Sequence, residues 1–536
     1  MDNAAPDFSN WECKDCPNGA VCDAIPDATW SAVIARAGYY RMPGPAPQNF
    51  SDCLNQDACL GVSASSPPYG NVSEGCLTSK GYTGTLCHSC MQGYVRSGQH
   101  ACRKCVLPHV IFSVGVLGSI GLVVYLFRRL RSAMKKNRGK SKKVEMELLK
   151  VMLNSAYGLG ILVSYPLAYP AAVTPFLDAS RTVSSVQSEA LGIGCFLTPS
   201  SGSSLFLTKS TFALVSPFIA IGLTAMYWSC VFMWTMRNRE QHRRRRQRGS
   251  QMDPGQIRSA LKNNFSICVI LILFMTLPSL SRTASSILNC VMIAPGVVRL
   301  QDDADVECWK GEHMVYVILA ALPSHMLYSI GFPLTGFVLL RRRARQNKLH
   351  FETSSDGRGS ALFFLHSGYR PERYYWEFVI FARKVALNMV LVLNLDGLLS
   401  GLLGLFVLQA AFGLHIVKQP FKNTFVNDAE SASLLLTSST LFVGLFFFSD
   451  VLSEAPRVFL SVLLSAIVIV AAVVFASLFL YLVSLRRCKT VAKRCTLCQR
   501  IVEGREKKGE TQNSGQSTSM EMMPPSRWVT PPVADI

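Results

Sequence analysis

Long apolar stretches alternate with short polar segments along most of the chain after residue 107. A helix needs about 20 mostly apolar residues to cross a bilayer. By this measure the hydrophobic pattern predicts about nine transmembrane helices. Their approximate ranges are 108–127, 148–170, 208–234, 264–288, 314–340, 376–394, 398–417, 431–449 and 457–485.

Basic residues concentrate at every second gap between these stretches. Clusters of Lys and Arg occupy 128–143, 237–246, 341–345 and 486–494, whereas 171–207 contains only Arg181. Lys and Arg accumulate in short cytoplasmic loops. The pattern therefore predicts an all-α multi-pass membrane protein whose N-terminus is outside and whose C-terminus is cytoplasmic.

The formal net charge of +20 admits two interpretations. The arginines at 243–246 fit a crude nuclear-localisation pattern. They also lie next to a predicted membrane helix, where basic side chains contact anionic headgroups. We favour the second interpretation, with the anionic inner leaflet as a partner and no nucleic acid.

The first 107 residues are dense in cysteine and poor in long apolar runs. A chain this short buries little core, and disulfides compensate in oxidising compartments. The paired spacings Cys87-x-x-Cys90 and Cys102-x-x-Cys105 also fit zinc. The outside location favours disulfides and no metal, with up to five pairs of unassigned connectivity. The cysteines concerned are Cys13, Cys16, Cys22, Cys53, Cys59, Cys76, Cys87, Cys90, Cys102 and Cys105.

Other outer segments carry modification and pairing candidates. Asn49 and Asn71 begin glycosylation sequons in the cysteine-rich segment. Cys290 and Cys308 share one predicted outer loop, and they either pair or remain buried thiols.

Charged residues inside predicted spans are candidates for function. Glu377, Arg383 and Lys384 lie early in the sixth stretch. Glu377 and Lys384 are two turns apart, so we expect Glu377 to bind a neighbouring helix. Arg383 and Lys384 either extend back to the inner interface or serve a function. We expect Arg282 to reach the outer interface.

Motifs for known transport or catalytic chemistry are missing from the sequence. We find no Walker motif, potassium-filter sequence or arginine-repeat voltage sensor. Asp396, Asp450 and Glu454 occupy short outer gaps, where they either favour cations at an outer mouth or are ordinary turn residues. Because these motifs are missing, we expect no enzyme activity and no cofactor.

Two parts of the chain resemble known domains. Residues 81–87 resemble the closing turn of an EGF-like module, and 87–105 resemble a laminin-type EGF or ephrin-receptor-like cysteine repeat. From the fourth stretch onward the chain resembles the TRP-like membrane domain of protist, algal and fungal surface proteins. That resemblance rests on Leu277-Pro278, Cys290, Asp302-Asp303, Cys308, His313, Gly331, Pro333, Tyr375-Trp376-Glu377, Arg383-Lys384, Pro420-Phe421, Asn427 and Glu430.

The resemblance implies a channel-like protein of the plasma membrane that conducts cations and has a sensing or tethering ectodomain. The alternatives are a non-conducting adhesion protein or receptor, and a transporter of lipids or small solutes. We expect an extracellular module over 1–107, a membrane domain over 108–485 and a disordered cytoplasmic tail over 486–536. An extracellular ligand or matrix component and further copies of the chain are the expected partners. We also expect the chain to be the C-terminal part of a longer protein, because the cysteine-rich segment starts abruptly.

Overall fold

The computed structural model describes parts of residues 15–105 and, with short gaps, residues 108–133, 141–184, 204–245, 254–347, 362–448 and 455–470. Cys195 and a few isolated positions are also described. The segment predicted to be a disordered tail, 486–536, lies outside these residues.

The N-terminal segment forms very short antiparallel strand pairs held by cystines. Four disulfides lie within it: Cys16–Cys22, Cys53–Cys59, Cys76–Cys87 and Cys90–Cys102. The strands are β1 (Ala20–Val21), β2 (Ile34–Ala35), β3 (Tyr39–Arg41), β4 (Phe50–Asp52), β5 (Tyr82–Thr83), β6 (Ser89–Cys90), β7 (Tyr94–Ser97) and β8 (Ala101–Lys104). Strands this short bury little by themselves, so the cystines supply much of the buried core. We call this segment the cysteine module.

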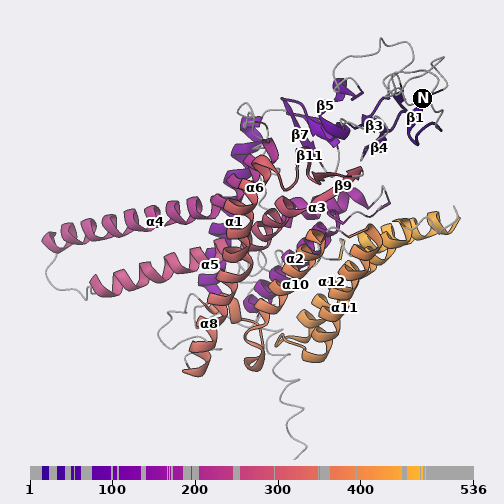
Figure 1. The fold of residues 1–536 in the computed structure, drawn as a ribbon. Coiled ribbons are helices and arrows are strands. Elements are labelled where there is room, and N and C mark those ends of the chain that lie inside the picture. The colour runs from indigo at the N-terminus through magenta and orange to yellow at the C-terminus, as the bar shows by residue number, and fades with distance from the viewer. Residues whose placement is uncertain are drawn as a thin grey trace, which may run out of the picture. The chain divides into compact units, whose positions relative to one another are not determined.

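Helices make up most of the remaining described chain (Figure 1). They are α1 (Pro108–Ala133), α2 (Ser141–Leu162), α3 (Thr174–Ser184), α4 (Leu205–Arg245), α5 (Pro254–Leu288), α6 (Gly311–Tyr316), η6 (Val317–Ala321), α7 (Leu322–Ser324), η7 (His325–Gly331), α8 (Phe332–Arg345), α9 (Phe363–His366), η8 (Pro371–Arg373), α10 (Trp376–Val392), α11 (Gly397–Lys418) and α12 (Thr424–Phe448).

Five helical stretches of the described chain are long and apolar enough to cross a bilayer. They are Leu205–Asn238, Gly255–Leu288, Gly311–Arg345, Gly397–Lys418 and Thr424–Phe448. Ser113–Arg128 and Ala455–Val470 are shorter apolar helices at the positions of the first and ninth predicted spans. The chain is therefore a multi-pass membrane protein, as the hydrophobic pattern predicted.

The second predicted span differs most from the structure. The sequence placed it at 148–170, but α2 begins at Ser141 and ends at Leu162. Pro166 and Pro170 follow, and each proline disfavours a helix because it lacks the amide hydrogen and restricts the residue before it. α2 is not among the five stretches above, and it carries the polar residues Lys150 and Asn154, both buried.

The fifth predicted span is one continuous helical stretch with wide turns in it. The π-helical segments η6 and η7 precede Pro323 and Pro333 by a few residues. A proline clashes with the carbonyl four residues earlier, and a wider turn relieves that clash. The prolines thus change the hydrogen-bond pattern of this helix without ending it.

A small sheet that the sequence did not predict joins α5 to α6. Strands β9 (Cys290–Ala294), β10 (Val297–Leu300) and β11 (Asp303–Glu307) pair antiparallel in the order β11-β10-β9. The Cys290–Cys308 disulfide closes this sheet, so these two cysteines are paired. The purely helical prediction for the membrane domain therefore missed this element.

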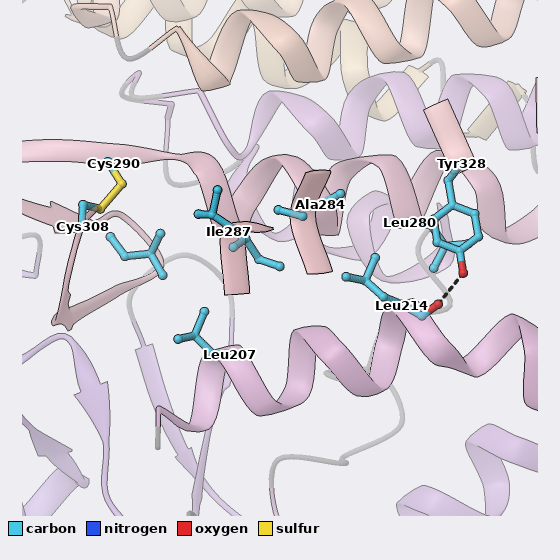
Figure 2. Close-up of a cluster of buried hydrophobic side chains, with 11 residues drawn as sticks. Leu207, Leu214, Leu280, Ala284, Ile287, Cys290, Cys308 and Tyr328 are labelled. Carbon is cyan, nitrogen blue, oxygen red and sulfur yellow. Dashed lines mark hydrogen bonds between the residues drawn. A yellow bond between two sulfur atoms is a disulfide. The ribbon is translucent and has the colours of Figure 1, made fainter. Parts of the chain in front are cut away.

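A buried cluster connects the sheet to three helices (Figure 2). Leu207 and Leu214 on α4 face Leu280, Ala284 and Ile287 on α5. The Tyr328 hydroxyl of η7 donates a hydrogen bond to the Leu214 carbonyl at 2.5 Å. Any movement of the sheet would therefore disturb a packed core that α4, α5 and η7 share.

One disulfide leaves the cysteine module. Cys105 pairs with Cys195, which lies between α3 and α4. Five pairs made only from the first ten cysteines are therefore excluded, while Cys13 lies outside the described residues. The zinc alternative is also wrong for this structure, because Cys87, Cys90, Cys102 and Cys105 all sit in disulfides.

A tryptic digest without reduction tests the Cys105–Cys195 pair. We expect a linked pair of peptides that contain these two residues, and its loss in Cys195→Ser. The peptides joined by Cys290–Cys308 serve as the internal control, since that pair should persist in the variant. Finding Cys105 linked to a cysteine in residues 13–102 would contradict the structure.

Candidate functional site

The cysteine module packs directly on the small sheet of the membrane domain. Ala304 of β11 is 3% exposed and belongs to the same buried cluster as the module residues Tyr40, Tyr82 and Leu86. Ile293 and Val297 of β9 and β10 pack against this cluster. We call the contact between the module and β9–β11 the junction.

The Asp305 carboxylate joins the two sides of the junction. Its Oδ1 accepts a hydrogen bond from the Thr85 amide at 2.7 Å, and its Oδ2 accepts one from the Ser89 hydroxyl at 2.6 Å. Gly84 lies against the same carboxylate with φ at +77°, and a Cβ there would be 2.4 Å from Asp305 Oδ2. This position needs glycine for both its backbone angle and its lack of a side chain.

Further hydrogen bonds cross the junction or lie beside it. Arg96 donates to the carbonyls of Asp302 at 2.8 Å and His88 at 2.6 Å. Ser51 donates to the Ile293 carbonyl at 2.5 Å. The junction therefore combines a shared apolar core with hydrogen bonds from four of the module's strands and turns.

Asp303 extends the contact to α4. Its Oδ2 accepts a hydrogen bond from the Ser204 hydroxyl at 2.6 Å, and Ser204 also accepts one from the Leu207 amide in the first turn of α4. Burial raises the pKa of the Asp303 carboxyl above its usual value. Burial disfavours the charged carboxylate, so Asp303 stabilises the folded chain most when it is protonated, at low pH.

One cluster of this region has the composition of a metal site. Cys290, Cys308 and His313 bring their ligand atoms within 4.8 Å of one another. The two sulfurs are bonded to each other. His313 Nδ1 accepts from the Trp309 amide at 3.0 Å, so Nε2 carries the proton and donates to the Ile287 carbonyl at 2.9 Å. This oxidised donor set offers no free thiolate or ring nitrogen to a metal.

The charged residues predicted inside the sixth span bind neighbouring helices. Glu377 forms a 3.1 Å ion pair with Lys150 of α2, and the Tyr369 hydroxyl donates to the same carboxylate at 3.0 Å. Lys150 also donates to the Phe364 carbonyl and lies 4.2 Å from the centre of the Phe364 ring. The expectation that Glu377 binds a neighbouring helix is confirmed.

Arg383 and Lys384 do not extend to the membrane interface. Arg383 pairs with Glu430 of α12 at 3.1 Å, and Lys384 donates to Asn154 of α2 at 2.7 Å. Arg282 is also buried, where it donates to Gly160 and Ser164 instead of reaching the outer surface. Interior polar partners hold these cations more favourably than apolar surroundings would. The expectation for Arg282 is therefore wrong, and of the two alternatives for Arg383 and Lys384 the extension back to the inner interface is not seen.

The predicted outer acids are only partly described. Asp396 precedes α11 and accepts a hydrogen bond from the Leu399 amide at 3.4 Å, so it acts as a helix N-cap. Asp450, Glu454 and the sequon residues Asn49 and Asn71 lie outside the described residues.

Sequence reasoning missed several residues of the junction and of the polar contacts between α2 and α10. Lys150 carries a signal that could have identified it, because it is a charge inside a predicted span. Asn154 and Asn388 are polar residues in spans and carry a weaker signal. Gly84 and Asp305 have none, since their contact joins segments 220 residues apart.

Comparison with known proteins gives one distant relative. The chain is 23% identical over 526 residues to cysteine repeat modular protein A of Toxoplasma gondii, a match that covers 81% of this chain. The chain spans 16% of the length of that protein. No protein-family model and no solved structure matches the chain.

Hydrogen exchange at the Thr85 amide tests the contact between Asp305 and the cysteine module. A hydrogen bond to a charged group contributes about 1.5–3 kcal/mol. We expect Asp305→Ala to speed hydrogen exchange at the Thr85 amide by roughly tenfold or more, measured by mass spectrometry. Glu307→Ala is the control, because Glu307 lies on the same strand and pairs with Lys310. Equal exchange in both variants would show that Asp305 does not hold the junction.

The buried His366 makes the folding stability of the chain depend on pH. Burial, aided by the charges of Lys150 and Lys422, lowers the pKa of His366 to about 4. The unfolded chain binds this proton near pH 6.5, so folding stability falls as pH drops from about 6.5 to 4, by on the order of 3 kcal/mol. We expect the thermal midpoint in detergent to fall over this window, and to fall less in His366→Gln. An unchanged pH dependence in that variant would assign the loss to other groups.

Proposed function

We propose that this chain is the membrane-embedded part of a cell-surface protein, and that it passes ligand binding or pulling force from a cysteine-rich ectodomain to its membrane helices. The observation that carries this proposal is the junction. The loop between α5 and α6 contributes Ala304 to the buried core of the cysteine module.

The chain connections favour transmission through this loop. Only Asn289 separates α5 from β9, and a short turn separates β11 from α6. A displacement of the module would act on both helices at once. The next helical stretch contains η6 and η7, and π-helical turns occur often at functional sites.

The location of the disulfides supports the proposed orientation. Cystines persist in oxidising compartments. All six described disulfides fall in segments that the distribution of Lys and Arg assigns to the outside. We therefore propose the plasma membrane as the location, and an extracellular ligand or matrix component as the partner. The name of the Toxoplasma relative refers to cysteine repeats, and we propose that the module here is one such repeat.

Ion conduction is a second candidate, as the TRP-like resemblance implies. Charged side chains in membrane interiors often mark ion or proton paths, and this chain buries Lys150, Glu377, Lys384 and Glu430. Their mutual pairing is also typical of helix packing. Asp396 supports conduction less than expected from the sequence, because its carboxylate caps a helix.

Hydrogen exchange of the chain in nanodiscs tests transmission. We expect Gly84→Ala to loosen the junction, because the added Cβ meets the Asp305 carboxylate, and to speed exchange in 311–345. Gly93→Ala is a matched control, since that glycine also has a positive φ but a Cβ there meets nothing within 4 Å. Faster exchange confined to the module in Gly84→Ala would contradict transmission to the helices.

Planar bilayers that contain the purified chain test conduction separately. The channel candidate predicts unitary currents that depend on the cation, and the receptor or tether predicts silence. Silence together with faster exchange at 311–345 would retain transmission and exclude conduction. Lipid or solute flux without current would favour the transporter alternative.

A further inference from the structure

Three polar contacts join α2 and α10 in the membrane part of the chain. Lys150 meets Glu377, Asn154 meets Lys384, and Tyr157 meets Asn388. The residue numbers rise together on both helices, so the helices run parallel. At 1.5 Å per residue, the contacts from 150 to 157 extend over about 10 Å of α2.

The two asparagines have defined orientations. Lys384 has only donors, so the Asn154 atom at 2.7 Å from it must be the acceptor Oδ1. The Tyr157 hydroxyl gives its proton to the Pro278 carbonyl at 3.0 Å, so it accepts from Asn388 Nδ2 at 2.9 Å. The atoms that remain, Asn154 Nδ2 and Asn388 Oδ1, are buried and have no hydrogen-bond partner among the described residues.

The ammonium of Lys384 is also incompletely satisfied. One of its three protons goes to Asn154, and its other contact is the face of the Tyr157 ring at 5.0 Å. Glu377 pairs with Lys150 and Glu430 Oε1 pairs with Arg383, and within the described chain neither carboxylate forms an ion pair with Lys384.

These groups together define the chemistry of a ligand. An unpaired buried donor or acceptor costs about 1–3 kcal/mol. A cation would be repelled by Lys384, and an anion would be repelled by the oxygen of Asn388. Water donates and accepts at once, and buried water makes about three hydrogen bonds to such groups.

We propose that Asn154, Lys384 and Asn388 bind internal water between α2 and α10, within the membrane part of the chain. The water accepts from Asn154 Nδ2 and from Lys384, and it donates to Asn388 Oδ1. It satisfies the unpaired amide atoms and hydrates the ammonium. This site does not depend on transmission through the junction.

Radiolytic footprinting of the wild-type chain in nanodiscs tests the proposal. X-rays generate hydroxyl radicals from water in place, so a tyrosine beside internal water is oxidised although it is buried. Tyr157 is 5% exposed, while Tyr165 and Tyr328 are 0% and 1% exposed and serve as matched controls. We expect Tyr157 to be oxidised roughly fivefold faster than either control, because only Tyr157 contacts the proposed water site.

A double variant separates internal water from residual exposure. Lys384→Met with Asn388→Leu removes two of the three polar partners, and Tyr157 oxidation should fall to the rate of Tyr165. Leu387→Met, a change on the same turn of α10, should leave Tyr157 oxidation unchanged. Equal rates for Tyr157 and Tyr165 in the wild type would overturn the proposal, even if the double variant does not fold. Rapid oxidation that persists in a folded double variant would overturn it as well.

Discussion

The ion pair between Lys150 and Glu377 constrains the arrangement of several elements of the membrane part at once. Both side chains are buried in a multi-pass membrane protein, where an unpaired charge is strongly unfavourable. Lys150 also holds the Phe364 carbonyl, and Tyr369 holds Glu377. The single pair therefore joins α2, α10 and the segment before α10. Separating α2 from α10 would leave both charges without a partner, and moving the segment before α10 would remove a hydrogen bond from each of them.

The module side of the chain is held together by different physics. There the strands are too short to bury much by themselves, and cystines supply much of the buried core. The junction adds a shared apolar cluster and the hydrogen bonds of Asp305. Polar pairing in the membrane and cystines outside it thus solve the same problem, which is how to fix segments that have little hydrophobic driving force between them.

The sequence was most informative where a single physical quantity decides the pattern. Bilayer thickness determines the length of an apolar stretch, so the position of α11 could be predicted closely. The apolar parts of α4, α5 and α12 were also located, but each of these helices extends well beyond its predicted range at one end. The end of α2 was misjudged because apolar residues continue past Leu162 although the helix does not. The partners of Arg383, Lys384 and Cys105 depend on which segments pack together, and no local pattern contains that information. The same holds for the sheet β9–β11, whose strands are short and lie between two long spans.

The Cys105–Cys195 bond has a consequence for how the cysteine module can be released from the membrane helices. The bond closes a covalent ring that contains α1, α2 and α3. A protease that cuts the chain once between these two cysteines opens the ring but leaves the module attached through the disulfide. Shedding by such a cut would also require a reductant. The module can therefore remain anchored after proteolytic damage that would free an ectodomain attached only by its polypeptide.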